Sequence, residues 1–303
     1  MDGRVLIPIS LFAVLGIVRA MQKICTKKTS ALVNQGEMFF RYGAYYQLLA
    51  ALTSLVTLFI VGFHGFNVPT LLCAVASAVC LSVSIFSSIE AMKGCTLVLI
   101  NMTSSASILI PCVLGIFLFD EPMGALQWVG LVVFMLSAYF LVSDSKSTNH
   151  KISIKTVMML LAYFVAEGSI VVVQKYFAKS VPDGNTAMFS FLMFASNAVM
   201  LFLCAIAVTV RNRRKEKVKF SVMPLDKKLY AYGAVLAIAV FMVNIVVTTL
   251  AKTVDSVVLF SAESIISISV TTAVGALFFK EKITVKKTVG ILVGLVAVFL
   301  INL

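Results

Sequence analysis

Charged residues are scarce in this chain. Of its 303 residues 13% are charged and 60% are hydrophobic, and the mean hydropathy is +1.04. A soluble domain cannot bury that much apolar surface, because its exterior needs polar and charged side chains. Apolar runs of roughly 18 residues or more recur along the whole length, which is the pattern of transmembrane helices. The composition therefore predicts an all-α integral membrane protein.

The motifs of catalysis and of cofactor binding are missing as well. The two histidines, His64 and His150, lie between apolar runs, and there is no HExxH, GxSxG, Walker or GxGxxG pattern. The six cysteines form no CxxC pair, and most of them fall inside apolar runs, which is typical of small packing residues. We therefore expect no enzymatic activity, no cofactor and no metal site.

Acidic residues are outnumbered, with 13 Asp and Glu against 25 Lys and Arg, and the formal net charge is +12. The basic residues lie mainly between the apolar runs, where they orient a chain in the bilayer, so the charge does not indicate nucleic acid. Residues 1–20 have Arg4 ahead of an apolar run but no clear cleavage site for a removable signal peptide. The lipid bilayer is the expected partner, and a homodimer stays open.

A long internal repeat is present. Residues 91–142 align with residues 251–302 without a gap, and each copy is an apolar segment, a tight acidic turn and a second apolar segment. Identical pairs include Ser104 and Ser264, Ser107 and Ser267, Gly115 and Gly275, Phe119 and Phe279, Glu121 and Glu281, and Gly130 and Gly290. The pair Gln22-Lys23 matches Gln174-Lys175 in the same way. We infer that the duplication covers both halves of the chain.

The apolar runs predict about ten spans. We expect them at 5–22, 38–62, 69–91, 95–119, 124–143, 154–177, 186–210, 229–250, 255–279 and 286–302. The polar break at 143–151 separates two halves, 1–147 and 148–303, of five spans each. An odd number of spans per half places the second half upside down, which gives the inverted repeat of many secondary transporters.

Several motifs occur at corresponding places in the two halves. Span two contains Phe39-Phe40-Arg41-Tyr42, and acidic turns follow spans four and nine at 119–122 and 279–282. A glycine-bearing helix follows each turn, in 127–130 and 288–291. Over its whole length the chain resembles the EamA type of the drug/metabolite transporter superfamily. It departs from the usual Gly-Glu turn, and Pro111 has Thr271 as its counterpart.

The resemblance implies a multi-pass transporter of the cell membrane that carries small organic solutes, such as metabolites, amino acids or drugs, by alternating access. With no ATP site, we expect an exporter or exchanger that uses an ion gradient. Two other readings are a flippase for lipid-linked substrates and a non-transporting sensor or assembly subunit. Neither the coupling ion nor the substrate follows from the sequence.

Ionisable residues at membrane depth are costly and mark functional sites. Glu167 falls near the middle of span six and Glu263 in the first half of span nine, so both are candidates for proton coupling. Desolvation disfavours a charged carboxylate and makes proton uptake possible near neutral pH. A structural carboxyl bonded to a neighbouring helix is the alternative for each of them.

Polar side chains also line spans four and nine, and we expect the solute to bind between the halves. The candidate substrate-binding residues are Asn101, Ser104, Ser107, Tyr163, Ser264 and Ser267. The serines recur at i, i+3 spacing, which places them on one helix face, although close helix packing explains serines equally well.

Six further features have simpler interpretations. Arg19 and Lys23 near the end of span one read as interfacial anchors, and Tyr42 reads as an interfacial aromatic. Glu37 one turn before Arg41 suggests a local pair, and Glu90 suggests an interfacial position. Pro111 predicts a kink in span four, and Gly290 and Gly294 predict close helix packing.

The positive-inside rule predicts the orientation. The loops after spans two and four, at 62–67 and 120–123, carry no Lys or Arg, whereas their counterparts at 211–228 and 280–287 are strongly basic. All the strongly basic loops then lie on one side, which the rule assigns to the cytoplasm, with both termini outside. The family resemblance implies termini inside.

Overall fold

The described part of the chain is helical. The computed structural model describes residues 3–30, 32–33, 37–62, 67–92, 103–104, 106–120, 123–142, 153–181, 184–216, 226–279 and 285–301, and no strand occurs within these ranges. The helices are α1 (Gly3–Ser30), α2 (Glu37–Val61), α3 (Val68–Met92), α5 (Leu109–Phe119), α6 (Ala125–Val142), α7 (Ile154–Ser180), α8 (Thr186–Glu216), α9 (Lys227–Leu250), α10 (Ser256–Phe279) and α11 (Val285–Ile301). The expected all-α class is confirmed for these residues.

Five helices are long and apolar enough to cross a membrane. They are Glu37–Val61, Val68–Ser88, Ile154–Ser180, Thr186–Arg211 and Lys227–Leu250. Shorter apolar stretches lie within α1, α5, α6, α10 and α11. Large apolar side chains point outward on several helices, among them Phe59 at 80% exposure and Phe299 at 65%. Such a surface suits contact with lipid and is compatible with a helical membrane protein.

Helix ends differ from the predicted spans at three places. α1 continues to Ser30 and α8 to Glu216, because their polar, basic ends prolong the helix beyond the apolar core. α5 begins at Leu109 after a turn at Ser107 and Ile108, where a single helix was expected from residue 95. Pro111 has no N–H to give the Ser107 carbonyl, which instead accepts from Ile110 N at 3.1 Å.

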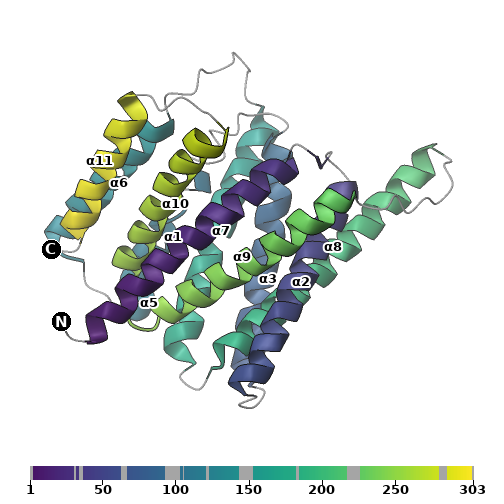
Figure 1. Cartoon of the computed structure of the whole chain (residues 1–303), viewed down its shortest axis with the longest axis horizontal. Coiled ribbons are helices and arrows are strands. Elements are labelled where there is room, and N and C mark those ends of the chain that lie inside the picture. The colour runs from purple at the N-terminus through teal and green to yellow at the C-terminus, as the bar shows by residue number, and fades with distance from the viewer. Residues whose placement is uncertain are drawn as a thin grey trace.

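Helices from the two parts of the chain interleave (Figure 1). α2 packs on α8, α6 on α11, and α3 on both α7 and α8. α9 packs on α1 and α2, α10 packs on α1, α5 and α11, and α5 packs on α7. Most of these pairs join a helix from residues 3–142 to one from residues 154–301. The interior therefore lies between the two parts rather than inside each of them.

Two apolar clusters hold the bundle together. One contains Leu15, Phe134 and Phe260. The other contains Phe177 and Phe189, whose stacked rings have their centroids 4.3 Å apart. In lipid the hydrophobic effect does not drive helices together, because their apolar side chains are already in an apolar solvent. Helices there associate mainly through close van der Waals packing.

The contact between α6 and α11 is close. Ser137 Oγ donates to the Gly290 carbonyl at 2.6 Å, and a Cβ on Gly294 would lie 2.8 Å from Ser137 Oγ. Small residues let the two backbones approach, as the sequence predicts for Gly290 and Gly294.

The start of α2 contains one predicted ion pair and one buried tyrosine. Arg41 forms an ion pair with Glu37 one turn earlier, so the predicted local pair is confirmed. Tyr42 is 3% exposed and its hydroxyl lies 3.2 Å from Thr29 Oγ1, so its ring faces neighbouring helices, and its interfacial depth stays a prediction. α1 and α9 cover this side chain through the cluster that includes Leu229.

Candidate functional site

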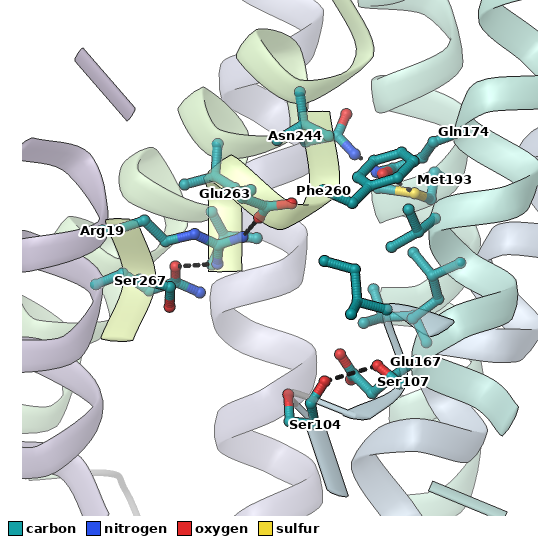
Figure 2. Close-up of a pocket in the computed structure, with 18 of the residues that line it drawn as sticks. Arg19, Ser104, Ser107, Glu167, Gln174, Met193, Asn244, Phe260, Glu263 and Ser267 are labelled. Carbon is teal, nitrogen blue, oxygen red and sulfur yellow. Dashed lines mark hydrogen bonds and ion pairs between the residues drawn. The ribbon is translucent and has the colours of Figure 1, made fainter. Parts of the chain in front are cut away.

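A polar cavity of about 300 Å³ lies among the helices (Figure 2). Its polar lining residues are Arg19, Gln22, Ser104, Ser107, Glu167, Gln174, Asn244, Glu263 and Ser267, and apolar side chains of α7, α8, α9 and α10 complete the wall. The volume falls at the lower end of the range for small-molecule sites. These polar groups lie inside helices with an apolar exterior, and the cavity is therefore the candidate functional site.

One side of the cavity is formed by an ion pair. Arg19 on α1 contacts Glu263 on α10, and Arg19 Nη1 donates to Gln22 Oε1 at 2.8 Å. The two charged side chains are 19% and 14% exposed, so the pair is mostly shielded. The interpretation of Arg19 as an interfacial anchor is therefore wrong. The side chain of Lys23 lies outside the described ones.

A second polar group surrounds Glu167 on α7. Ser84 on α3 donates to its carboxylate, and Tyr163, one turn earlier on α7, interacts with both Glu167 and Ser104. Ser107 Oγ donates to the Ser104 carbonyl at 2.7 Å. Figure 2 shows Ser104, Ser107 and Glu167 grouped apart from the pair of Arg19 and Glu263. The cavity thus has carboxylates in two separate places.

Gly168 makes the close approach of α5 and α7 possible. A Cβ at this position would lie 2.8 Å from the Ser107 carbonyl oxygen and 2.6 Å from Ile110 Cδ1. Glycine next to Glu167 therefore lets the turn that precedes α5 reach the cavity wall.

The third polar group lies on α9. Asn244 Oδ1 accepts from Ser190 Oγ at 2.6 Å, and its amide lies 3.8 Å from Met193 Sδ. Asn244 is 5% exposed, and both of its described partners lie on α8. The bonds fix an amide, which can donate and accept, at the cavity wall.

A lysine near the end of α7 forms a hydrogen bond with the turn between α9 and α10. Lys175 is fully buried, and its ammonium donates to the carbonyl of Val254. The neighbouring residue Gln174 lines the cavity. This bond joins α7 to the turn between α9 and α10.

The cavity brings together five of the predicted site residues. They are Ser104, Ser107, Glu167, Glu263 and Ser267. Tyr163 interacts with two of them but does not line the cavity as described. Asn101 lies outside the described residues, and so does the side chain of Ser264.

Other lining residues were not predicted. Gln22 and Gln174 occupy matching positions in the two halves, and that signal could have marked them. Asn244 could have been found as a polar residue inside a long apolar run. Glu90, read as interfacial, pairs with Lys155 at 3.0 Å, and that lysine is 71% exposed.

The described lining of the cavity supplies both charged and hydrogen-bonding groups. Its described charged residues are two carboxylates and one guanidinium. No group of three or more His, Cys, Asp or Glu residues suited to a metal occurs among the described residues. The site can offer charge, amide and hydroxyl contacts to a small polar molecule, and a carboxylate there can exchange a proton.

The described residues form a helical bundle that is compatible with a membrane protein and contains an internal polar cavity. No protein-family model and no curated protein matches the chain. Among solved structures 28 chains match. One of them, described as "Crystal structure of protein", has a TM-score of 0.73 at 13% identity and covers 97% of this chain and 98% of its own. The likeness establishes a shared fold over almost the full length of both chains.

Proposed function

We propose that the protein is a secondary transporter that carries small organic solutes across the cell membrane by alternating access. The observation that carries the proposal is the cavity, which holds Arg19, Glu167 and Glu263 inside a bundle of apolar helices. Charged groups at membrane depth are expensive to maintain and mark solute or ion pathways. A protein with a purely structural role has no need of such a site.

The pairing of helices supports two inverted halves, 1–147 and 148–303, of the EamA type. In this arrangement α1, α2, α3, α5 and α6 correspond to α7, α8, α9, α10 and α11. The contact between α3 and α7 then corresponds to the contact between α9 and α1, and the contact between α1 and α10 corresponds to that between α7 and α5. The pairs α2 with α8 and α6 with α11 map onto themselves. A two-fold axis in the membrane plane produces this pattern. Figure 1 places both chain ends at one edge of the molecule, as an even number of spans, such as ten, requires.

The energy for transport comes from an ion gradient or from exchange in this proposal. The sequence has no Walker motif, and Glu167 and Glu263 are groups that can bind a proton in the cavity. In an alternating-access cycle the cavity opens to each side in turn, so that a proton and a solute bound there cross by the same movement.

A counterflow experiment tests the proposal. Purified protein is first screened by thermal shift against pools of amino acids, amines, organic acids and nucleosides. Each stabilising compound is then loaded into proteoliposomes, and entry of its labelled form from outside is measured. We expect saturable uptake that unlabelled compound inside accelerates, because exchange needs a single alternating site.

Protein-free vesicles provide the baseline for this assay. The proposal fails when no pool stabilises the protein and no compound exchanges faster than in those vesicles. Movement of a lipid-linked sugar between leaflets, without exchange of soluble compounds, would identify a flippase. Ligand binding without exchange would identify a sensor.

A further inference from the structure

Arg19 has more hydrogen-bonding capacity than its described partners use. Its Nη2 contacts Glu263 Oε1 and its Nη1 donates to Gln22, whereas its buried Nε has no partner among the described residues. A guanidinium presents a planar fork of N–H groups that matches the two oxygens of a carboxylate. A carboxylate on a solute can therefore engage the Nη groups of Arg19 in place of Glu263.

Resting on the transport function proposed above, we propose that Glu263 stands in for a carboxylate on the transported solute. The solute binds by displacing Glu263 from Arg19, and Glu263 then takes up one proton. Both residues line the cavity, so a solute in it can reach the guanidinium without rearrangement of the helices. Figure 2 shows the ion pair facing the space that Phe260 and Asn244 also border.

The proton balance follows from the surroundings of Glu263. In the empty site the charges of Arg19 and Glu263 cancel. After displacement Arg19 holds the solute carboxylate, and Glu263 is a mostly shielded carboxylate that has lost its counter-ion. Low-dielectric surroundings disfavour that charge, so one proton enters from the solvent for each solute bound.

Few other titratable groups face Glu263. Arg19 approaches from α1, Cys112 lies on α5, and Glu167 and Tyr163 lie on α7 at the cavity. The described side chains of α6 and α11 contribute no titratable group. Glu167 is therefore the other acid that could take the proton, and a variant must separate the two.

The rest of the cavity indicates the remainder of the solute. Glu167 with Ser84 forms an acceptor site apart from Arg19, which suits an ammonium group. Between the two polar ends the wall includes apolar residues such as Val171, Val243 and Phe260. The structure points to a small zwitterion with an apolar body, held by its carboxylate at Arg19 and by its ammonium at Glu167.

Calorimetric titration of the full chain in detergent tests this inference with three matched probes: ε-aminocaproate, whose two charges flank an apolar chain, ε-aminocaproamide, which lacks the carboxylate, and caproate, which lacks the ammonium. Running ε-aminocaproate in buffers of different ionisation enthalpy counts the protons exchanged. We expect uptake of about one proton per ε-aminocaproate bound. The affinity for ε-aminocaproamide should be lower by about tenfold or more, because it cannot engage Arg19.

Two glutamine variants separate the two acids. Glu263→Gln should bind ε-aminocaproate with no proton uptake and with an affinity independent of pH, since Arg19 is already released. Glu167→Gln should keep the uptake of one proton but lose the preference for ε-aminocaproate over caproate. Glu90→Gln, which changes an acid paired with Lys155 away from the cavity, should behave as the wild type.

Several results would overturn the inference. They are ε-aminocaproate that fails to bind, ε-aminocaproamide that binds as well as ε-aminocaproate, and proton uptake that survives Glu263→Gln. If Glu263→Gln does not fold, Glu263→Asp replaces it and should shift the pH dependence. Counterflow of ε-aminocaproamide or of other compounds without a carboxylate would leave the transport function standing while refuting the role of Glu263.

Discussion

Glu167 and Glu263 each lie within an apolar run of the sequence, but their side chains have different partners in the structure. Glu263 is neutralised by Arg19, whereas Glu167 accepts from the hydroxyl of Ser84 on α3. A charge-assisted ion pair and a hydroxyl contact respond differently to protonation, because a proton removes the ion pair but leaves a hydrogen-bonding carboxyl. The two acids therefore need not have the same role in the cycle.

Proton coupling through these acids can be measured. In the double variant Glu167→Gln/Glu263→Gln we expect counterflow to become independent of pH, because the described cavity lining then contains no carboxyl group. The measurement is the initial rate of exchange across a pH series in proteoliposomes. A double variant that keeps the wild-type pH profile would show that the proton binds elsewhere.

The glycine beside Glu167 gives a stability prediction. Gly168→Ala should destabilise the protein by roughly 1–3 kcal/mol, because the added methyl group meets a backbone carbonyl that cannot move independently. Gly16→Ala is the matched control, since its Cβ would lie at an ordinary 3.6 Å from Ile266. Thermal unfolding in detergent should show a lower midpoint for the first variant and an unchanged or higher one for the second. Equal midpoints would contradict the close approach.

The sequence was informative about acids and misleading about Arg19. Glu167 and Glu263 stand out because a carboxylate within an apolar run needs a reason to be there. Arg19 lies three residues before the predicted end of span one at residue 22, which favoured an interfacial position. In the structure α1 continues to Ser30, so Arg19 lies well inside the helix. Helix ends follow capping and packing as well as hydropathy, and a single chain does not reveal them.

At the scale of helices, the interface of α6 and α11 depends on small residues. Gly294→Ala should destabilise it by roughly 1–3 kcal/mol, since a methyl group would press against Ser137 Oγ. The double variant Gly294→Ala/Ser137→Ala should recover part of that loss, because the obstructing oxygen is gone. The measurement is the thermal midpoint of each variant in detergent.

The single variant Ser137→Ala is the control for that cycle. It removes the hydrogen bond to the Gly290 carbonyl and should cost about 0.5–1.5 kcal/mol. A double variant that is no more stable than Gly294→Ala alone would mean that the contact with Ser137 does not limit the approach of the helices.

Most helices could be predicted from apolar length, but the break before α5 needed a local argument. Pro111 predicts a kink, and the structure places a turn at Ser107 and Ile108. The sequence could not say that this turn would lie against Gly168 on α7, because that contact depends on how two distant helices pack. Periodicity reports the environment of a helix and not the identity of its neighbour.

At the scale of the whole molecule, the orientation in the membrane can be tested. The positive-inside rule predicts that the basic segment at 211–228 faces the cytoplasm and that both chain ends face outward. Cysteines are introduced singly at Ser221, which lies outside the described residues, and after Leu303, in a background without native cysteines such as the exposed Cys204. An impermeant thiol reagent added to intact cells should label the second position and not the first. The reverse pattern would establish the opposite orientation, which the family resemblance implies.

The sequence predicted the duplicated arrangement of helices better than it predicted the residues that line the cavity. The alignment of 91–142 with 251–302 predicted equivalent helices, and the exchange of helix pairs is what two equivalent halves would produce. The charges do not follow the repeat: Glu263 has Thr103 as its counterpart, and Arg19 with Gln22 has Val171 with Gln174. A repeat predicts a scaffold, whereas the residues that break its symmetry are found by examining each position.

The buried lysine of α7 has a consequence for the order of synthesis. Lys175 bonds to Val254, a residue 79 positions later in the chain. At ordinary elongation rates the ribosome needs roughly 4–16 s to make that segment. During this interval α7 exists while the Val254 carbonyl does not. The native contact between α7 and the turn that joins α9 to α10 therefore forms only after most of the chain has been synthesised.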